Sequence, residues 1–579
     1  MLAKVWRLPP SPSPERDTLA RALGVAPVVA GLLIARGCTE ERAARRFLDP
    51  HLDHCHDPLL LPDMASAAAR LARAVREREA VLVHGDYDVD GVCAAALLTR
   101  ALRTLAVPVT PFIPHRQRDG YDLSVETVRR AAAEGFRLIL TADCGSIAFE
   151  AAEAARDLGV DLIVTDHHEA QERLPPALAV VNPKRRDGAY PFPDLCGAAV
   201  AYKLIWATLR ELGLPEGGFR KRYLDLVALA TAADCVPLLD ENRALVKHGL
   251  HVLADTRKPG LRALMRVAGV DPRFLTVRHL AFALGPRINA VGRLGAATQA
   301  LELLLMEDNA TASALAERLD EVNQVRQEEQ ERILQDATRQ ALRYIDDRIL
   351  VLASPRWHPG IIGIVASKMV ELHGRPAVLV AIDEEAGVGR GSARSISGYH
   401  IFQALDACRS LLIRCGGHQT AAGFDVDAAC VEALRSALQE VAAQTLSDGL
   451  LEPAIHIDAM VPAAAVTLRL ADELACLEPF GHGNHEPVLY SGALDVVRCE
   501  RLAARAKGAQ DHLRLYVRPQ GAPGAPVEAV LWRGWERASE IPAGGRLDLC
   551  YTLGVNAYQG LRAARLDVKD LRPAGQTRK

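Results

Sequence analysis

The sequence lacks several features that mark common classes of protein. Its 12 cysteines include no CxxC pair, which argues against a zinc ribbon and against a small disulfide-bonded scaffold. No uninterrupted apolar run reaches the roughly 18 residues of a membrane-spanning helix. The N-terminal stretch MLAKVWRLPPSPSPERD has no apolar core of a secretory signal. We therefore expect a protein of the reducing cytoplasm with no membrane association.

A strong charge of one sign is also absent. The 69 basic and 72 acidic residues leave a net charge of −3, and aromatic residues make up only 5% of the 579 residues. This balance excludes a basic coat for non-specific nucleic-acid binding, so any such contacts must come from local clusters. The length suggests about three or four domains, and the composition is ordinary for a soluble globular protein.

Short apolar runs that each end in polar residues begin at residue 80. Ala-rich amphipathic segments lie between these runs, and this alternation predicts an α/β fold with a parallel sheet. Catalytic residues in such sheets sit at the carboxyl ends of strands, where the polar clusters fall. The runs are AVLVHGD (80–86), RLILTADCG (137–145), DLIVTDHHE (161–169) and ALAVVNP (177–183).

The pattern divides the chain into five segments. We expect an N-terminal helical segment, an α/β catalytic domain, a connecting helix, a smaller α/β domain and a small β-barrel. The connecting segment contains neither Gly nor Pro, and its dense charges are typical of a solvated face rather than a binding site. In chain order the expected bounds are 1–75, 76–310, 311–345, 346–450 and 453–575.

The segment HGDYDVDG (84–91) concentrates acidic residues. Asp86, Asp88 and Asp90 occupy alternate positions, with His84 just before them. Alternate residues of an extended segment share a face, so these carboxylates converge, and like charges this close need a cation or solvent to offset them. Oxygen ligands with one or two imidazoles favour Mn²⁺ or Mg²⁺ over a thiolate-bound metal. The segment therefore predicts part of a metal site.

Other segments add matching groups. Asp143 lies in TADCG, Asp166, His167 and His168 lie in TDHHE, and Asp234 lies in ALATAADCVPL (228–238). An ionised carboxylate that follows apolar and small residues needs a partner if it is buried. Taken alone, Asp143 is equally well explained as a helix cap or a solvated loop residue. The segments together favour one shared metal centre.

A separate group of histidines leaves two interpretations open. HLDHCHD (51–57) packs three His and one Cys into seven residues, which suits either a metal site or a surface turn. The group precedes the α/β pattern and has no matching ligand group downstream. A surface turn is the favoured interpretation.

These motifs jointly resemble a known family. HGDYDVDG, TADCG, TDHHE and ATAADCVP are similar to the motifs of the DHH phosphoesterase superfamily. GPRINAVGR (285–293) and GGHQTAAGF (416–424) make the resemblance specific to its RecJ family of single-strand-specific exonucleases. The resemblance covers nearly the whole chain. It implies a parallel-sheet DHH domain, a long helix, a smaller α/β DHH-associated domain and an OB-like β-barrel.

The resemblance also assigns roles at the metal site. It implies two divalent cations, Mn²⁺ or Mg²⁺, with Asp143 bridging them. The superfamily spacing H-x-x-x-D-x-D is met by His84, Asp88 and Asp90, which ranks His84 above Asp86; Asp86 either ligates a cation or orients another ligand. Asp143 and His168 are the expected catalytic residues, and His168 would stabilise transition-state charge or protonate the leaving group. The expected metal ligands are His84, Asp86, Asp88, Asp90, Asp143, His167 and Asp234.

Contacts with DNA are expected in three further motifs, among them GRGSARSISG (389–398) and CGGHQTAAGF (415–424). Closely spaced glycines let backbone N–H groups approach phosphate oxygens, and an arginine grips a phosphate in a fork. The alternative is that these glycines only form turns. The candidate contacts are Arg287, Asn289, Arg293, Arg390, Ser392, Arg394, Gly416, Gly417 and His418.

The function that the resemblance implies is 5′→3′ hydrolysis of single-stranded DNA to mononucleotides, in DNA repair and recombination. One alternative is a phosphodiesterase for short oligonucleotides or cyclic dinucleotides, although such relatives are typically much shorter. Another is a scaffold protein, but scaffold relatives have lost metal ligands that this chain keeps. The expected partners are single-stranded DNA with a 5′ end, a single-stranded-DNA-binding protein and a helicase, and we expect a monomer.

Overall fold

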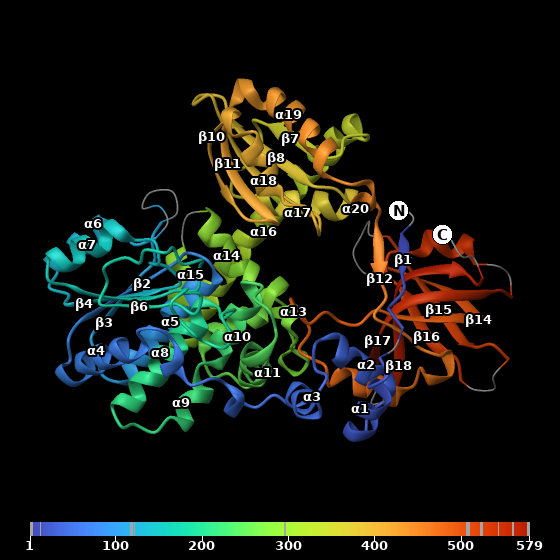
Figure 1. Ribbon diagram of the computed structural model, residues 1–579, viewed down its shortest axis with the longest axis horizontal. Coiled ribbons are helices and arrows are strands. Elements are labelled where there is room, and N and C mark those ends of the chain that lie inside the picture. The colour runs from blue at the N-terminus through green and yellow to red at the C-terminus, as the bar shows by residue number, and fades with distance from the viewer. Residues whose placement is uncertain are drawn as a thin grey trace.

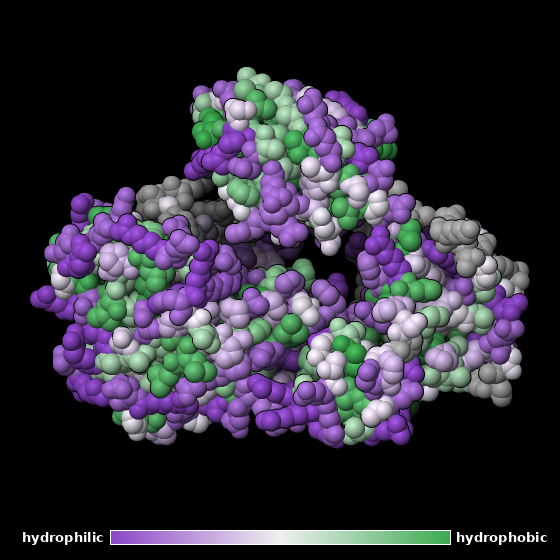
Figure 2. All heavy atoms as spheres, in the orientation of Figure 1, coloured by the Kyte–Doolittle hydropathy of each residue, from purple (hydrophilic) through white to green (hydrophobic). Residues whose placement is uncertain are grey.

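Three masses surround an opening in the molecule. A parallel-sheet region lies on one side, a barrel region on the other, and a mixed-sheet region spans the top (Figure 1). The space-filling view shows the hollow between them (Figure 2). The computed structural model describes residues 4–11, 13–115, 120, 122–294, 297–504, 510–521, 525–541, 544–558 and 561–575.

The parallel-sheet region has the strand order β3-β2-β4-β5-β6. Its strands are apolar runs because helices cover both faces. Val81 and Val83 of β2 pack with α4, α5 and α8, whereas Leu82 packs on the opposite face with α6 and α7. The elements are α4 (Met64–Glu77), β2 (Val81–Gly85), α5 (Val89–Thr104), β3 (Val109–Phe112), α6 (Val125–Ala133), β4 (Leu138–Ala142), α7 (Phe149–Asp157), β5 (Asp161–Thr165), β6 (Ala179–Val181) and α8 (Gly197–Glu211).

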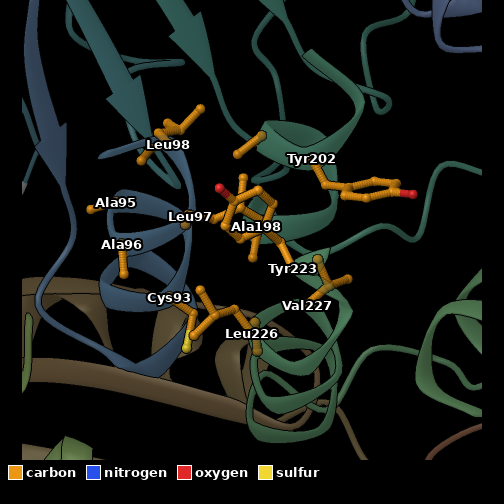
Figure 3. Packing of buried hydrophobic residues seen from close by; sticks show 14 of the residues in the cluster. Cys93, Ala95, Ala96, Leu97, Leu98, Ala198, Tyr202, Tyr223, Leu226 and Val227 are labelled. Carbon is orange, nitrogen blue, oxygen red and sulfur yellow. The ribbon is translucent and has the colours of Figure 1, made fainter. Parts of the chain in front are cut away.

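Helices after α8 complete the core of this region. Figure 3 shows Cys93 of α5 beside Leu226 of α10, and α5 also contributes the small Ala94, Ala95 and Ala96 to the core. Small side chains allow the helices to approach closely. The helices are α9 (Gly217–Arg222), α10 (Leu224–Ala233), α11 (Asp240–Ala254), α12 (Pro259–Val267), α13 (Val277–His279), the π-helix η4 (Leu280–Leu284), α14 (Gly285–Leu294) and α15 (Ala297–Leu305).

A single long helix leads from the first sheet to the second. It is α16 (Asn309–Ala341), continued by the 3-10 turn η5 (Leu342–Tyr344). The carboxylate of Asp308 caps it by accepting a hydrogen bond from the Thr311 N–H at 2.7 Å. The absence of Gly and Pro lets the helix run without a break.

The mixed-sheet region has the strand order β10-β11-β9-β8-β7, and only β7 and β8 are parallel neighbours. α17 packs on Leu350, Leu352 and Leu379, which lie on β7 and β8. On β11 and β10, Gly423 and Gly416 are exposed. The elements are β7 (Leu350–Ser354), α17 (Ile362–His373), β8 (Ala377–Asp383), β9 (Val388–Arg394), α18 (Ile401–Ala407), β10 (Leu412–Gly417), β11 (Ala421–Asp427), α19 (Val431–Thr445) and α20 (Asp448–Leu451).

The barrel region closes through the pairing of β14 with β17, in the order β14-β15-β16-β18-β17. The N-terminal helices share its core, where Leu33 and Phe47 pack with Leu549, and β1 pairs with β12. The elements are β1 (Val5–Arg7), α1 (Arg16–Leu23), α2 (Pro27–Ala35), α3 (Glu41–Leu48), β12 (Ala454–His456), β13 (Ala459–Met460), α21 (Leu468–Ala475), β14 (Leu489–Leu502), β15 (His512–Pro519), β16 (Val527–Leu531), β17 (Arg546–Tyr558) and β18 (Leu561–Pro573).

This architecture confirms the predicted fold class of a parallel-sheet domain, a long helix, a smaller α/β unit and a β-barrel. In the described part of the chain, no single helix is long and apolar enough to cross a membrane. The pair α1 and α2 meets the length and composition test only jointly, and the two helices are bent by 113°.

Arg243 of α11 joins the parallel-sheet region to the barrel region. Its guanidinium is buried and donates hydrogen bonds to the carbonyl oxygens of Phe47 at 2.7 Å and Glu478 at 2.6 Å. It also lies over the Phe47 ring, 4.0 Å from its centroid. Burial lowers the pKa of Arg243 to about 10, so the side chain remains charged at neutral pH.

Replacement of this buried arginine tests the connection. We expect Arg243→Ala to lower the free energy of unfolding by about 3 kcal/mol, because buried carbonyl oxygens lose their donors and a cavity forms. Thermal unfolding followed by circular dichroism measures the change. Arg42→Ala, on the exposed side of α3, is the control, with an expected change below about 0.5 kcal/mol. Equal melting temperatures for the two variants would contradict the assigned role.

Candidate metal centre

Three neighbouring strands bring the acidic and imidazole side chains to one edge of the parallel sheet. β2 lies between β3 and β4, and β4 lies beside β5. The segment of Asp86 and Asp88 follows β2, Asp143 follows β4, and His167 follows β5. Because parallel strands end at the same edge, residues distant in sequence become neighbours. Asp234 joins them from the carboxyl end of α10.

The His167 imidazole stands among three carboxylates. Its Nε2 lies 3.1 Å from Asp143 Oδ1, 3.6 Å from Asp90 Oδ2 and 3.6 Å from Asp234 Oδ2. The side chains of His167, Asp90 and Asp143 are buried, and that of Asp234 is about one-quarter exposed, at 26%. One face of the cluster therefore remains open to solvent.

Three overlapping groups of side chains have the spacing of metal ligands. Within each group, one ligand atom per residue lies within 4.8 Å of the others. The groups are Asp143 with His167 and His168, Asp90 with His167 and Asp234, and Asp86 with Asp88 and Asp143.

The family spacing ranks His84 above Asp86 as a metal ligand, whereas the fold brings only Asp86 into a ligand-spaced group. Asp86 belongs to one of the three groups, whereas His84 belongs to none of them. The Nδ1 atom of His84 lies 3.6 Å from the Cys144 sulfur, and its ring packs against Phe112 with centroids 5.4 Å apart.

The amino end of α8 holds Asp90 in place. Both carboxylate oxygens of Asp90 accept backbone hydrogen bonds, one from Gly197 at 2.6 Å and one from Ala198 at 2.7 Å. An added Cβ at Gly197 would lie 2.6 Å from Asp143 Oδ1. Only glycine at this position lets the helix end approach both carboxylates. Its N–H groups and helix dipole stabilise negative charge there.

The buried carboxylates repel one another. Burial, with the charge of Asp234, raises the pKa of Asp90 to about 7. Burial, with the charge of Asp88, raises the pKa of Asp234 to about 7. Burial and the charges of Asp90 and Asp88 raise the pKa of Asp143 well above its usual value. A divalent cation would offset this charge, and the carboxylate and imidazole donors suit Mn²⁺ or Mg²⁺. The residues therefore fit the predicted metal.

The imidazole of His168 is hydrogen-bonded to Asp166, a carboxylate outside the ligand-spaced groups. Its Nδ1–H donates to Asp166 Oδ1 at 2.8 Å, and its side chain is about half exposed, at 48%. Burial opposes the charged form, but the hydrogen bond to Asp166 and the charge of that carboxylate outweigh burial and raise the pKa of His168 to about 9. His168 is therefore a cationic donor at the open side of the cluster.

Two residues that shape this site, Asp166 and Gly197, were not among the predicted site residues. Asp166 fixes the ring of His168, and its position directly before His167 was the available signal. Gly197 bonds Asp90 from far along the chain, and no local pattern at either residue indicates that contact.

The motif GPRINAVGR (285–293) contacts residues 84–91, which we call the metal loop. Asn289 Oδ1 accepts a hydrogen bond from the Val89 N–H at 3.1 Å, and Arg287 Nε donates to Asp320 Oδ1 at 2.8 Å. Both predicted DNA contacts thus have partners within the protein. Arg293 lies on α14, but its side chain is outside the described residues.

The remaining predicted DNA contacts gather on one face of the mixed sheet. Ser392 on β9 pairs in register with Gly423 on β11, which pairs with Gly416 on β10. Arg394 Nη1 donates to Ser392 Oγ at 3.1 Å, beside Gly363 of α17. Arg390 lies on the same face of β9, and Gly417 and His418 follow Gly416; these three are exposed. The structure therefore brings these side chains and glycines together on one surface.

The histidine group at 51–57 has local partners. His54 Nδ1 accepts the His51 N–H at 3.1 Å, and His56 Nε2 lies 3.0 Å from Asp240 Oδ1. None of these histidines enters the ligand-spaced groups found among the described residues. This arrangement agrees with the favoured interpretation as a turn.

Comparisons with known families follow the three regions. Residues 80–231 match the DHH family N-terminal domain, residues 346–444 the DHHA1 domain, and residues 457–570 the RecJ OB domain. The matched segments contain, in turn, the parallel sheet, the mixed sheet and the barrel.

Relatives match over nearly the whole chain. The single-stranded-DNA-specific exonuclease RecJ of Bacillus subtilis is 35% identical over 96% of this chain and 70% of its own. The crystal structure of RecJ from Thermus thermophilus in complex with Mn²⁺ has a TM-score of 0.82 at 34% identity, over 99% of this chain and 80% of that one. Its complex with Mg²⁺ has a TM-score of 0.75 at 32% identity, over 99% and 79%.

Both kinds of similarity point the same way. The relatives are similar to this chain in sequence, and the RecJ crystal structure is also similar in fold over nearly the whole chain. The cluster of acidic and histidine side chains at the strand ends is consistent with metal-dependent hydrolysis. The chain therefore belongs to the RecJ family of the DHH superfamily and is a single-stranded-DNA-specific exonuclease, an enzyme that hydrolyses phosphodiester bonds.

Proposed function

We propose that this exonuclease degrades single-stranded DNA from its 5′ end, in the 5′→3′ direction, and releases mononucleotides during DNA repair and recombination. The observation that carries the proposal is the ligand-spaced cluster around His167 in a chain that also has a basic, glycine-lined sheet face and a barrel. These are the parts that a processive enzyme needs to cut one end while holding the strand beyond it.

Two divalent cations, Mn²⁺ or Mg²⁺, are proposed for the centre. Asp143 and His167 each belong to two of the ligand groups. A carboxylate has two oxygens and can bind two cations, whereas an imidazole nitrogen binds one, so Asp143 is the proposed bridging ligand. Asp86 and Asp88 would complete one position, and Asp90 and Asp234 the other. Bound there, the cations would polarise the phosphodiester and lower the pKa of the attacking water. His84 remains a candidate ligand on the resemblance alone.

His168 is the proposed acid of the reaction. Its cationic imidazole is held by Asp166 and is about half exposed at the open side of the cluster. A donor in this position stabilises negative charge on a phosphoryl oxygen or gives its proton to the leaving oxygen. Asn182 supports the loop by donating from Nδ2 to the His168 carbonyl at 2.9 Å.

The exposed face of β9, β11 and β10 is the proposed phosphate-binding surface. Arg390 and Arg394 supply charge, and Ser392 and His418 supply further hydrogen-bond donors. Gly416 and Gly417 leave the backbone accessible to phosphate oxygens. Arg287 and Asn289 are proposed to act indirectly, because they fix α14 against α16 and the metal loop.

A cavity lies among α14, α16 and α17. It has a volume of about 610 Å³ and includes Asn289, Arg326 of α16 and Lys368 of α17 in its lining. Arg326 is nearly buried, with 8% of its surface exposed, and bonds only neutral amide oxygens, those of Asn323 and Gln330, among the described residues. We therefore include this cavity in the proposed DNA path.

The domain bounds and partners expected from the sequence enter the same proposal. Residues 76–310 would carry catalysis, 311–345 the connection, 346–450 phosphate binding and 453–575 contacts with the single strand. A monomeric enzyme that cooperates with a single-stranded-DNA-binding protein and a helicase stays a prediction.

The direction of cutting and the length preference test the proposal together. A long single strand labelled at its 5′ end should yield labelled mononucleotide first, whereas a 3′ label should stay on long fragments. Gel separation of the products measures this. Faster hydrolysis of dinucleotides than of the long strand would instead support the alternative of a short-oligonucleotide phosphodiesterase.

Asp143→Ala removes the proposed bridging ligand. We expect loss of turnover by at least about three orders of magnitude, because no other side chain replaces a shared carboxylate. The rise in melting temperature on adding Mn²⁺ should also shrink, while binding of single-stranded DNA persists. Asp157→Ala, at the far end of α7, is the control and should behave as wild type. Near-normal activity of Asp143→Ala would refute the bridging role.

Arg394→Ala tests the phosphate-binding surface. We expect DNA binding to weaken by about tenfold at low salt and by less at high salt, because a contact with phosphate is screened. Fluorescence anisotropy at several salt concentrations measures this. Arg339→Ala, an exposed arginine of α16, serves as the matched control. Equal affinities of the two variants at low salt would remove Arg394 from the DNA path.

A further inference from the structure

A second cavity lies at the end of α5 opposite the metal centre. It has a volume of about 830 Å³, and its lining includes Arg100, Arg103 and Thr104 from the last turn of α5. The metal loop meets the first turn of that helix at Asp90. At 1.5 Å per residue, Asp90 and Thr104 are about 20 Å apart along the helix axis. The cavity is therefore separate from the catalytic site.

Basic side chains dominate the walls of this cavity. Six of its lining residues are Arg or Lys and three are acidic. Two of the acidic residues are already neutralised, since Glu307 pairs with Arg100 at 2.6 Å and Asp225 pairs with Lys258 at 2.7 Å. Four cations make no ion pair with any residue that the structure describes: Arg103, Lys221, Arg222 and Arg257.

Hydrogen bonds among the lining residues hold one side of the cavity together. Asp225 is fully buried, and its carboxylate accepts hydrogen bonds from Thr256 at 2.8 Å and from Lys258. The Lys258 ammonium also donates to the Arg222 carbonyl at 2.8 Å. These bonds tie the segment between α11 and α12 to the start of α10. The four cations without ion pairs therefore lie on three elements that are held in place: α5, α9 and the segment between α11 and α12.

This excess of positive charge is local. The whole chain carries a net charge of −3, whereas the cavity sets four unpaired cations against one further carboxylate, that of Asp255. Like charges held close together repel one another, and a ligand of opposite charge relieves that repulsion. The volume lies within the range of about 300–1,000 Å³ that is usual for small-molecule sites.

We propose that this cavity binds the closely spaced phosphate groups of a small polyanion, such as a nucleoside triphosphate or inorganic polyphosphate. Several arginines from different directions suit phosphate oxygens, because each guanidinium donates two parallel hydrogen bonds. The cavity is open to solvent and is bounded by α5, α9 and the segment between α11 and α12. This shape suits a compact ligand better than a long strand, which requires a continuous groove.

Calorimetric titration of the full-length enzyme with inorganic tripolyphosphate and with ATP tests the site. We expect saturable binding that Arg103→Glu combined with Arg257→Glu weakens by at least about tenfold, since two attractive charges become repulsive. The matched control combines Arg42→Glu and Arg129→Glu, two exposed arginines outside the cavity, and should bind as wild type does. Exonuclease activity of both variants confirms that they fold.

Competition experiments identify the source of the phosphates. Displacement of tripolyphosphate from the wild-type enzyme by single-stranded DNA would assign the phosphates to the DNA backbone and overturn the assignment to a small polyanion. Equal displacement by poly-glutamate would overturn the proposal in favour of an acidic peptide. Binding that survives the charge reversal would place the ligand elsewhere, including at the metal centre, and would also overturn it.

Discussion

Carboxylates crowd the edge of the parallel sheet, where burial and their mutual repulsion raise the pKa values of Asp90, Asp143 and Asp234. Such a cluster is unfavourable unless opposite charge is brought to it. The surrounding fold offsets part of this repulsion through the amino end of α8, whose N–H groups and dipole face Asp90. A divalent cation would offset the rest. Much of the molecule can be understood as support for this arrangement.

That support extends well beyond the strand ends. α5 begins at the metal loop and packs against α8 and α10, the helices at whose ends Gly197 and Asp234 lie. Asn289 holds the loop from α14, and Arg287 ties α14 to α16. Through α16, the position of the metal loop is coupled to that of the mixed sheet. Arg287 and Asn289, two of the DNA contacts predicted from the motif GPRINAVGR, thus help to fix the metal loop relative to the mixed sheet.

The fold class could be predicted because its signals are local. Apolar runs that end in polar residues mark the strands of a parallel sheet, and an uninterrupted charged segment marks α16. The position of the N-terminal helices could not be predicted this way. Their apolar faces show that they pack against something, but their partner is a barrel core more than 400 residues later, reached through the pairing of Val5 with Ala454. Hydrophobic periodicity carries no information about such a partner.

The sequence by itself determined the chemistry of the site: carboxylates and imidazoles at strand ends indicate a hard divalent cation, and the resemblance to DHH phosphoesterases implies a phosphodiester substrate. Only the tertiary structure decided how these groups are combined. Spacing favoured His84 over Asp86, yet the fold groups Asp86 with Asp88 and Asp143 and sets His84 against Cys144. The physical reason is that ligation depends on distances of a few ångströms between separate strands. Strand order, turn geometry and helix packing fix those distances, and none of them is encoded in the spacing within one segment.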